Sequence, residues 1–163
     1  MMIFCANVFL FAQKSPIYLE RCNRLEFDQE RLPDCQVLKD DVVFTHEGAI
    51  LYCDSAYFFD KTNSVDAFGH IRIEQGDTLF VFGDILHYDG NTKMARLKGN
   101  VRMINRETTL ETDSMDYDRN IDVGYYFTGG TIYDEKSKLT SIYGEYSPQT
   151  KISKFQNDVR LLN

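Results

Sequence analysis

Apolar and polar residues alternate along most of this chain, in short segments that resemble one another. Five such segments are LKDDVVF from Leu38, AFGHIRI from Ala67, LKGNVRMI from Leu97, FTGGTIY from Phe127 and FQNDVRL from Phe155. Around the central Gly, Asp or Asn of each segment, the positions two before, two after and four after are mostly apolar, and those between them are mostly polar. A period of two with one apolar face predicts half-buried β-strands.

The central residues of these segments recur at a nearly fixed spacing. They are Asp40, Gly69, Gly99, Gly129 and Asn157. A second series interleaves with the first, at Asn23, Asp54, Asp84, Asp113 and Gly144, and has nearly the same spacing. Two series with one period predict about five stacked units of ~30 residues and two strands each, which bury their apolar faces only against one another.

The second series carries a change of phase. Before its Asp the apolar positions are odd-numbered relative to it, as at Leu51 and Val81, and after it they are even-numbered, as at Leu86 and Met115. Such a switch at a short polar residue predicts a bulge or corner. The central Gly of the first series, Gly99 for example, is expected to be a tight backbone position within a strand. The units therefore build two facing sheets, as a sandwich or a groove.

Composition narrows the class of partner. The chain has 163 residues, 43% of them apolar, with 12 Phe, 10 Tyr and no Trp. These values are typical of a globular, strand-rich domain with no transmembrane segment. A net charge of −7 argues against nucleic acid, which is bound through Lys and Arg. A lipid ligand would have to be held by its acyl chains.

The N-terminal segment 1–13 differs from the rest of the chain. It is expected to be either a clipped or atypical export signal or a first strand, with residues 14–163 forming a single domain. The four cysteines, Cys5, Cys22, Cys35 and Cys53, include no CxxC pair, which disfavours zinc and thioredoxin-like chemistry. Buried free thiols are favoured over a structural disulfide.

No group of side chains predicts catalysis, a metal site or a cofactor. Asp113, Asp116 and Asp118 fall in a segment whose alternation would place the first two on opposite faces of a regular strand. The histidines His46, His70 and His87 occupy different columns without a second ligand at metal-binding spacing, and His70 is expected on the surface. The series Arg72, Arg102 and Arg160, with Lys39 and Lys98 nearby, is expected on a solvated face, paired with acidic neighbours. The alternative is a basic stripe that meets lipid phosphates or a partner.

The segments GDILHYDGNTKMARLKGNV and TDSMDYDRNIDVGYYFTGGTI resemble the OstA-like family, which includes LptA, LptC and the N-terminal part of LptD. The family pattern is a D-x-x-x-Y-D segment, a turn and an A-x-L-x-G-N-V segment. The residues that match it are Asp84, Tyr88, Asp89, Ala95, Leu97, Gly99, Asn100 and Val101. The following unit keeps Asp113, Tyr117, Asp118, Phe127 and Gly129 but has Thr131 in place of Val.

The resemblance implies an all-β, open β-jellyroll in the periplasm, without enzymatic activity. Its apolar interior would shield the acyl chains of lipopolysaccharide or lipid A on the way to the outer membrane. Domains of this family would join end to end through their terminal strands. The residues we expect to line the groove and contact acyl chains are Leu86, Leu97, Val101, Met103, Met115, Phe127 and Tyr133. The alternative is a structural β-repeat scaffold with a packed interior, which docks envelope proteins through its sheet edges.

Overall fold

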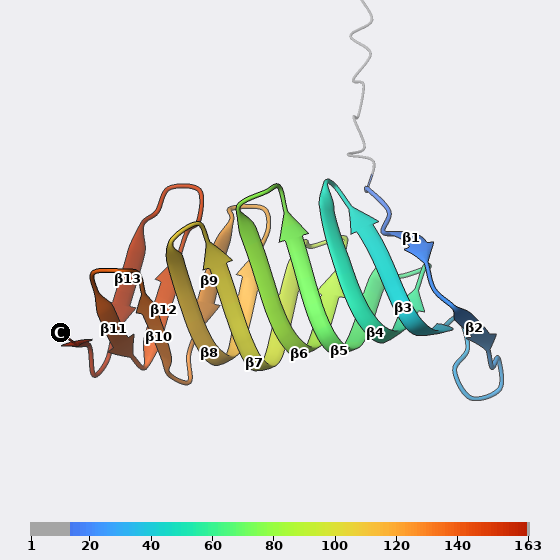
Figure 1. Ribbon diagram of the computed structural model, residues 1–163. Helices are drawn as coiled ribbons and strands as arrows, with labels where there is room; N and C mark the ends of the chain where they lie inside the picture. The colour runs from blue at the N-terminus through green and yellow to red at the C-terminus, as the bar shows by residue number, and fades with distance from the viewer. Residues whose placement is uncertain (1–13, 163) are drawn as a thin grey trace, which may run out of the picture.

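The computed structural model describes residues 14–162, and the predicted signal or first strand at residues 1–13 lies outside them. Six long antiparallel strands form the middle of one continuous sheet. They are β3 (Gln36–His46), β4 (Ala49–Phe59), β5 (Ser64–Gln75), β6 (Leu79–Asp89), β7 (Met94–Asn105) and β8 (Thr108–Asp118). Figure 1 shows them as successive rungs along one long axis. The expected all-β architecture, an open antiparallel sheet, is confirmed.

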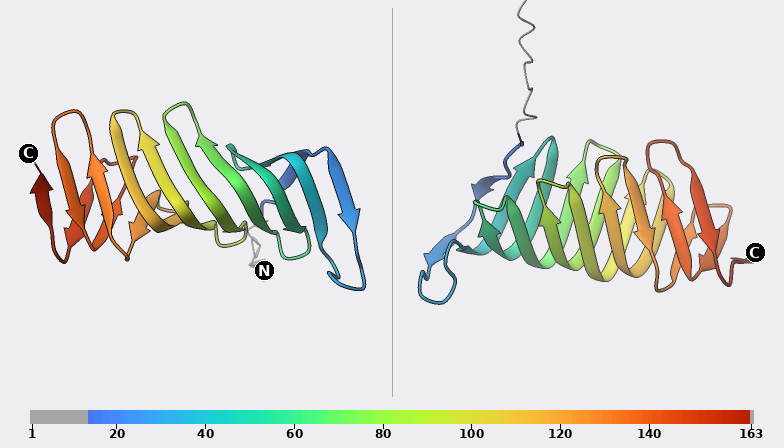
Figure 2. Two further views of the ribbon diagram at one scale, coloured as in Figure 1. Left: turned by 60° about the horizontal axis from the view of Figure 1, so that its bottom comes forward. Right: turned by 180° about the vertical axis from the view of Figure 1, so that it is seen from behind.

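Shorter strands continue the sheet at both ends. β1 (Tyr18–Arg21) and β2 (Arg24–Phe27) precede the long strands. After them come β9 (Val123–Tyr126), β10 (Gly130–Tyr133), β11 (Lys138–Ser141), β12 (Tyr143–Tyr146), β13 (Ser153–Gln156) and β14 (Arg160–Leu162). In both views of Figure 2 the first and the last strands lie at opposite ends of the axis. Residues 14–162 contain no helix long and apolar enough to span a membrane.

Each long strand bends in its middle and contributes to two walls. The register of every pair from β3–β4 to β7–β8 shifts at this point, for example between Phe68 and Ile71 on β5. The first wall contains β2, β9, β12 and β13. It also contains the first halves of β3, β5 and β7 and the second halves of β4, β6 and β8. The second wall contains β1, β10, β11, β14 and the other halves. The predicted corner is therefore present in each pair of long strands.

Left-handed backbone makes the corner. The five central residues have positive φ, from 62° at Asp40 to 78° at Gly99 and 101° at Gly129. In four units the next residue is left-handed too, as at Asn100, where φ is 47°. The Asn100 Nδ2 donates a hydrogen bond of 2.7 Å to Asp84 Oδ2, which comes from the second predicted series. His70 and Asp54 meet at the same distance one repeat earlier. The expectation of a tight backbone position at Gly99 is confirmed.

The core lies between the two walls. It consists of inward residues of both, including Leu38, Val42, Ile71, Leu86, Leu97, Val101, Met103, Leu110, Met115 and Tyr126, each at most 1% exposed. The three cysteines in the described residues are unpaired, and burial raises the pKa of the Cys53 thiol to about 12, which keeps it protonated at neutral pH. Apolar burial on both inner faces, at roughly 25 cal/mol per Å², holds the walls together.

Replacing Gly99 by Ala should weaken the fold through the corner. An added Cβ would lie 2.5 Å from Asp84 Oδ2 and 2.9 Å from Asp84 Cβ, so rotating the carboxylate does not relieve the contact. Left-handed backbone adds about 1 kcal/mol for a residue with a side chain. We expect Gly99→Ala to lower the free energy of unfolding by about 2–3 kcal/mol in urea denaturation.

The matched control is Gly48→Ala. Gly48 has a φ of 80° in a turn, but a Cβ there would meet nothing within 4 Å. This variant should lose only the backbone contribution, about 1 kcal/mol. Equal losses in the two variants would contradict the close approach of the strands at the corner.

Candidate functional site

The candidate site has two parts. One is the apolar interior between the walls, and the other is the long side of the molecule where the turns of the two walls face each other. We call this side the mouth. Turns of the first wall, such as Gly90–Lys93 and Arg119–Asp122, lie across it from turns of the second wall, such as Glu47–Gly48. The interior is apolar because strand alternation directs one face of every strand inward, and the mouth is polar because turn residues meet there.

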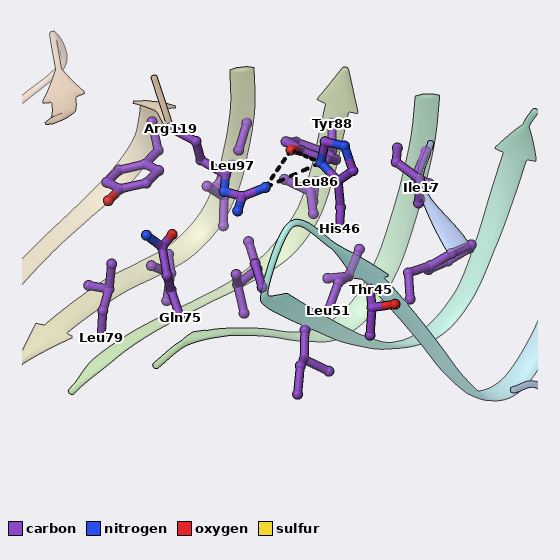
Figure 3. A pocket seen from close by; sticks show the side chains of 18 residues that line it. Ile17, Thr45, His46, Leu51, Gln75, Leu79, Leu86, Tyr88, Leu97 and Arg119 are labelled. Carbon is purple, nitrogen blue, oxygen red and sulfur yellow. Dashed lines mark hydrogen bonds between the residues drawn. The ribbon is translucent and has the colours of Figure 1, made fainter. Parts of the chain in front are cut away.

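A cavity of about 40 Å³ lies beneath the mouth. Its lining is almost entirely apolar and includes Ile17, Phe44, Leu51, Ile73, Leu86 and Leu97. Figure 3 shows the Arg119, Tyr88 and His46 side chains converging at one border, with Leu51 and Leu79 on other parts of the lining. The volume holds a few water molecules and is far below the ~300–1,000 Å³ of a typical ligand pocket.

Polar bonds connect the two walls across the mouth. Lys93 of the first wall forms an ion pair of 2.7 Å with Glu47 of the second. Further along, Gln75 Nε2 donates to Asp122 Oδ1 at 3.3 Å. Asn105 Nδ2 then donates to the Tyr146 hydroxyl at 2.9 Å and to the Pro148 carbonyl at 3.0 Å. A hollow of about 260 Å³ lies between the contacts of Gln75 and those of Asn105.

The densest of these contacts is a chain of three side chains. Arg119 Nη1 donates to the Tyr88 hydroxyl at 2.7 Å, and that hydroxyl lies 2.7 Å from His46 Nδ1. His46 Nε2 lies 3.0 Å from the carbonyl oxygen of Ser15, which can only accept. The neutral His46 ring therefore carries its proton on Nε2, and Nδ1 accepts from Tyr88. Burial lowers the pKa of His46, with the nearby charges of Arg119 and Lys93 acting in the same direction.

The segment Ser15–Ile17 crosses the mouth beside this chain. The Ile17 backbone N–H donates to Asn63 Oδ1 at 2.7 Å, and Asn63 Nδ2 donates to the Ser15 carbonyl at 2.9 Å. Asn63 belongs to the first wall and His46 to the second, so the segment bridges the two. The Ile17 side chain is 5% exposed and fills part of the apolar cavity.

Five of the seven predicted groove residues lie in this interior. Leu86, Leu97, Val101, Met103 and Met115 are each 1% exposed, and Leu86 and Leu97 also line the cavity. Whether any of them contacts a lipid stays a prediction. They pack in one core cluster, as inward residues of any two-walled sheet must.

Phe127 and Tyr133 are not brought together with these five. Phe127 is 58% exposed and packs against Tyr143 with ring centroids 5.5 Å apart. The Tyr133 hydroxyl donates to Glu111 at 3.0 Å on the solvent side. The neighbours Tyr126 and Ile132 point inward instead. In this repeat Gly130 is not left-handed as its counterparts are, and the inward positions are displaced by one residue on both sides of the corner.

The remaining candidate residues lie on the outer surface. Asp113 and Asp116 both face away from the core, because the bulge at Asp113 changes the phase that a regular strand would keep. His70 is exposed as expected, with its pKa raised by the hydrogen bond to Asp54. Arg72 and Arg160 pair with Glu74 and Asp158, whereas Arg102 stacks on Phe82 with its guanidinium carbon 5.0 Å from the ring centroid. Residues 14–162 contain no cluster of three potential metal ligands.

Sequence reasoning missed the His46–Tyr88–Arg119 chain and the Ser15–Ile17 crossing. The residues that these hydrogen bonds join lie 31 to 73 positions apart in the sequence. Only the period could have placed Tyr88, at the end of β6, and Arg119, in the turn after β8, at the same edge of successive repeats.

Comparisons with known proteins show the family through a family model and the fold through a solved structure. A family model described as OstA-like protein matches residues 14–163. A similar solved structure is that of LptH from Pseudomonas aeruginosa, described as the LptA-homologous periplasmic component of the lipopolysaccharide transport device. It superposes with a TM-score of 0.56 at 16% identity, over 91% of this chain and 94% of that one. No curated protein sequence gives a significant match.

Acidification should destabilise the mouth through His46. A lowered pKa in the folded state means that the unfolded chain takes up a proton first. Stability is therefore complete above the unfolded pKa of about 6.5 and is lost as the pH falls toward the folded pKa, at up to about 1.4 kcal/mol per pH unit. We expect the wild type to lose more unfolding free energy than His46→Gln between pH 7.5 and 5.

His70→Gln is the control for this measurement. The pKa of His70 is raised, so its contribution is present below its unfolded pKa and is lost as the pH rises. Because His70 is exposed, His70→Gln should change the pH dependence of the unfolding free energy only slightly, and in the opposite sense to His46→Gln. A wild-type slope unchanged by His46→Gln would contradict the neutral, buried His46.

Proposed function

Because the chain belongs to the OstA-like family, we propose that it is a non-enzymatic periplasmic module that shields the acyl chains of lipopolysaccharide and relays them toward the outer membrane. The observation that carries this proposal is the construction of the interior. It runs along the molecule between two apolar walls, and along one side the walls are connected by polar contacts among residues in the turns and at the strand ends. An acyl chain could enter sideways by parting these contacts, without unfolding either wall.

The energies favour a ligand with several chains. Each polar contact of the mouth contributes about 0.5–1.5 kcal/mol net, so the bonds described across it are together worth several kcal/mol. Each buried methylene contributes about 0.8 kcal/mol, and a chain of about ten methylenes contributes about 8 kcal/mol. One acyl chain roughly offsets the loss of these polar contacts, and further chains also replace the apolar packing that the two walls lose as they part. A lipid A anchor supplies several chains, and a lysolipid supplies one.

The acidic surface is compatible with such a ligand. The net charge of −7 is spread over an elongated molecule, and exposed charges are screened over about 8 Å at physiological ionic strength. Attraction between the apolar interior and the acyl chains therefore outweighs the repulsion of anionic groups at a distance.

The ends of the sheet suit the end-to-end contacts expected from the family. Within residues 14–162, β1 and β2 at one end and β13 and β14 at the other each pair on one side only. Apolar side chains are exposed there, among them Leu25, Phe27, Leu161 and Leu162. An unpaired apolar strand edge is a template for pairing with another chain. We include other OstA-like domains as partners at these two ends.

Photo-crosslinking from inside the walls tests the groove. Azidophenylalanine in place of Phe44, which lines the cavity, should capture lipid A after ultraviolet irradiation. The same residue in place of Phe82, which lies on the outer face beneath Arg102, should capture little. Mass spectrometry of the adducts measures both yields, and a lysolipid should label Phe44 less than lipid A does at equal concentration.

Equal labelling at the two positions would reject the groove. Absence of labelling at Phe44, with the protein folded and lipid A present, would favour the packed scaffold that docks proteins through its edges. Thermal unfolding of each variant establishes that it is folded before irradiation.

A further inference from the structure

Arg119 occupies an unusual position at the mouth. It lies in the turn between β8 and β9, and its side chain lines the apolar cavity. Its guanidinium carbon lies 5.9 Å from the centre of the Tyr88 ring. Figure 3 shows the Arg119 side chain directed toward Tyr88 and His46, to which dashed hydrogen bonds connect it. A ligand that put its acyl chains into the interior at this end would bring its head group close to Arg119.

The hydrogen-bonding capacity of Arg119 is incompletely used. A guanidinium has five N–H donors. Nη1 donates to Tyr88 and lies 3.3 Å from His46 Nδ1, and Nη2 donates to the Glu47 carbonyl oxygen at 3.2 Å. Nε is buried and has no acceptor within the described part of the chain. A buried donor without an acceptor is unfavourable, and an acidic oxygen near this edge of the guanidinium would satisfy it.

The charge of Arg119 has no carboxylate partner within residues 14–162. Most arginines on the outer surface have one, for example Arg21 with Asp41 and Arg24 with Asp40. Among the described residues, no carboxylate oxygen lies within 4.0 Å of Arg119, and its acceptors are neutral. An anion would therefore compete with a hydroxyl, an imidazole and a carbonyl oxygen, and not with an existing ion pair.

The carboxylates nearest to this region have other partners. Glu47 forms an ion pair with Lys93. Asp122 accepts hydrogen bonds from Gln75 and Tyr117. The other two, Asp89 and Asp118, accept backbone N–H groups of their own turns. Lys93 lies in the turn that precedes Arg119 by one repeat, so a second cation stands on the same wall of the mouth.

From these contacts we infer that Arg119 is the anchor for the anionic head group of the amphiphile, with a phosphate or carboxylate as its ligand. The inference rests on the proposed function and adds the chemistry of the head group to it. Phosphate oxygens match the planar guanidinium donors. By drawing Arg119 away from Tyr88 and His46, the same group would loosen the mouth through which the chains enter.

Lipid A with and without its phosphates tests the anchor. The affinity of each form is measured by titration with wild-type protein, Arg119→Gln and Arg119→Lys. We expect the wild type to prefer the phosphorylated form about tenfold. Arg119→Gln should bind the two forms almost equally. Arg119→Lys keeps the positive charge but loses the planar, paired donors of the guanidinium, so its preference for the phosphorylated form should be intermediate. Arg102→Gln on the outer face is the matched control and should keep the full preference.

The ratio of the two affinities separates anchoring from closure of the mouth. If Arg119 only held the walls together, its removal would change both affinities by the same factor and leave the ratio intact. That result would overturn the anchor while the groove remained. Failure of the wild type to bind either form would overturn the groove and the anchor together.

Inorganic phosphate identifies the source of the anion. In the inferred arrangement the acyl chains hold the phosphate at Arg119, so free phosphate at millimolar concentration should displace little lipid A. Displacement of lipid A by free phosphate with equal affinity would overturn the head-group assignment. The thermal unfolding of each variant is recorded first, and Arg119→Lys provides the comparison if Arg119→Gln does not fold.

Discussion

The left-handed corner is the constraint on which the rest of the structure depends. A strand with alternating apolar residues buries one face only, and a flat sheet of such strands would leave that face in water. Two consecutive left-handed residues, as at Gly99 and Asn100, fold β3, β5 and β7 over so that their two halves face each other, and the strands paired with them bend at the same point without left-handed backbone. The side chain of Asp84 closes this bend with a hydrogen bond to Asn100. Repetition of the bend in successive repeats turns one sheet into two walls.

The polar mouth follows from the same bend. Because every long strand crosses from one wall to the other at the corner, the turns that join these strands lie on the opposite side. Turn residues are polar, so the interior is bordered on that side by hydrogen bonds and ion pairs such as Glu47–Lys93. The strand backbone at the corner and the polar contacts at the mouth thus close opposite sides of one interior. The polar contacts exchange with water at little cost, which makes the mouth the weaker side.

The repetition of the sequence was enough to predict the walls, but it could not predict what closes them. Period and alternation placed most of the expected groove residues inside correctly, because strand parity is a local property. Parity failed at Phe127, where the corner differs by one residue and Tyr126 takes the inward position. His46, Tyr88 and Arg119 belong to three different repeats, and each alone is an ordinary polar position near a turn. Their contacts depend on how far the sheet twists between strands, which is determined only once the walls have formed.

The interior is not an open channel along its whole length. Tyr126 is completely buried towards the end formed by the last strands, and its hydroxyl lies 2.5 Å from Ser141 Oγ. Gly130 and Gly144 pack against its ring, where a side chain would overlap it. An acyl chain passing along the whole interior would have to displace this ring, whereas an acyl chain entering from the mouth would not. The positions of Tyr126 and of the polar mouth therefore both favour lateral entry over threading from that end.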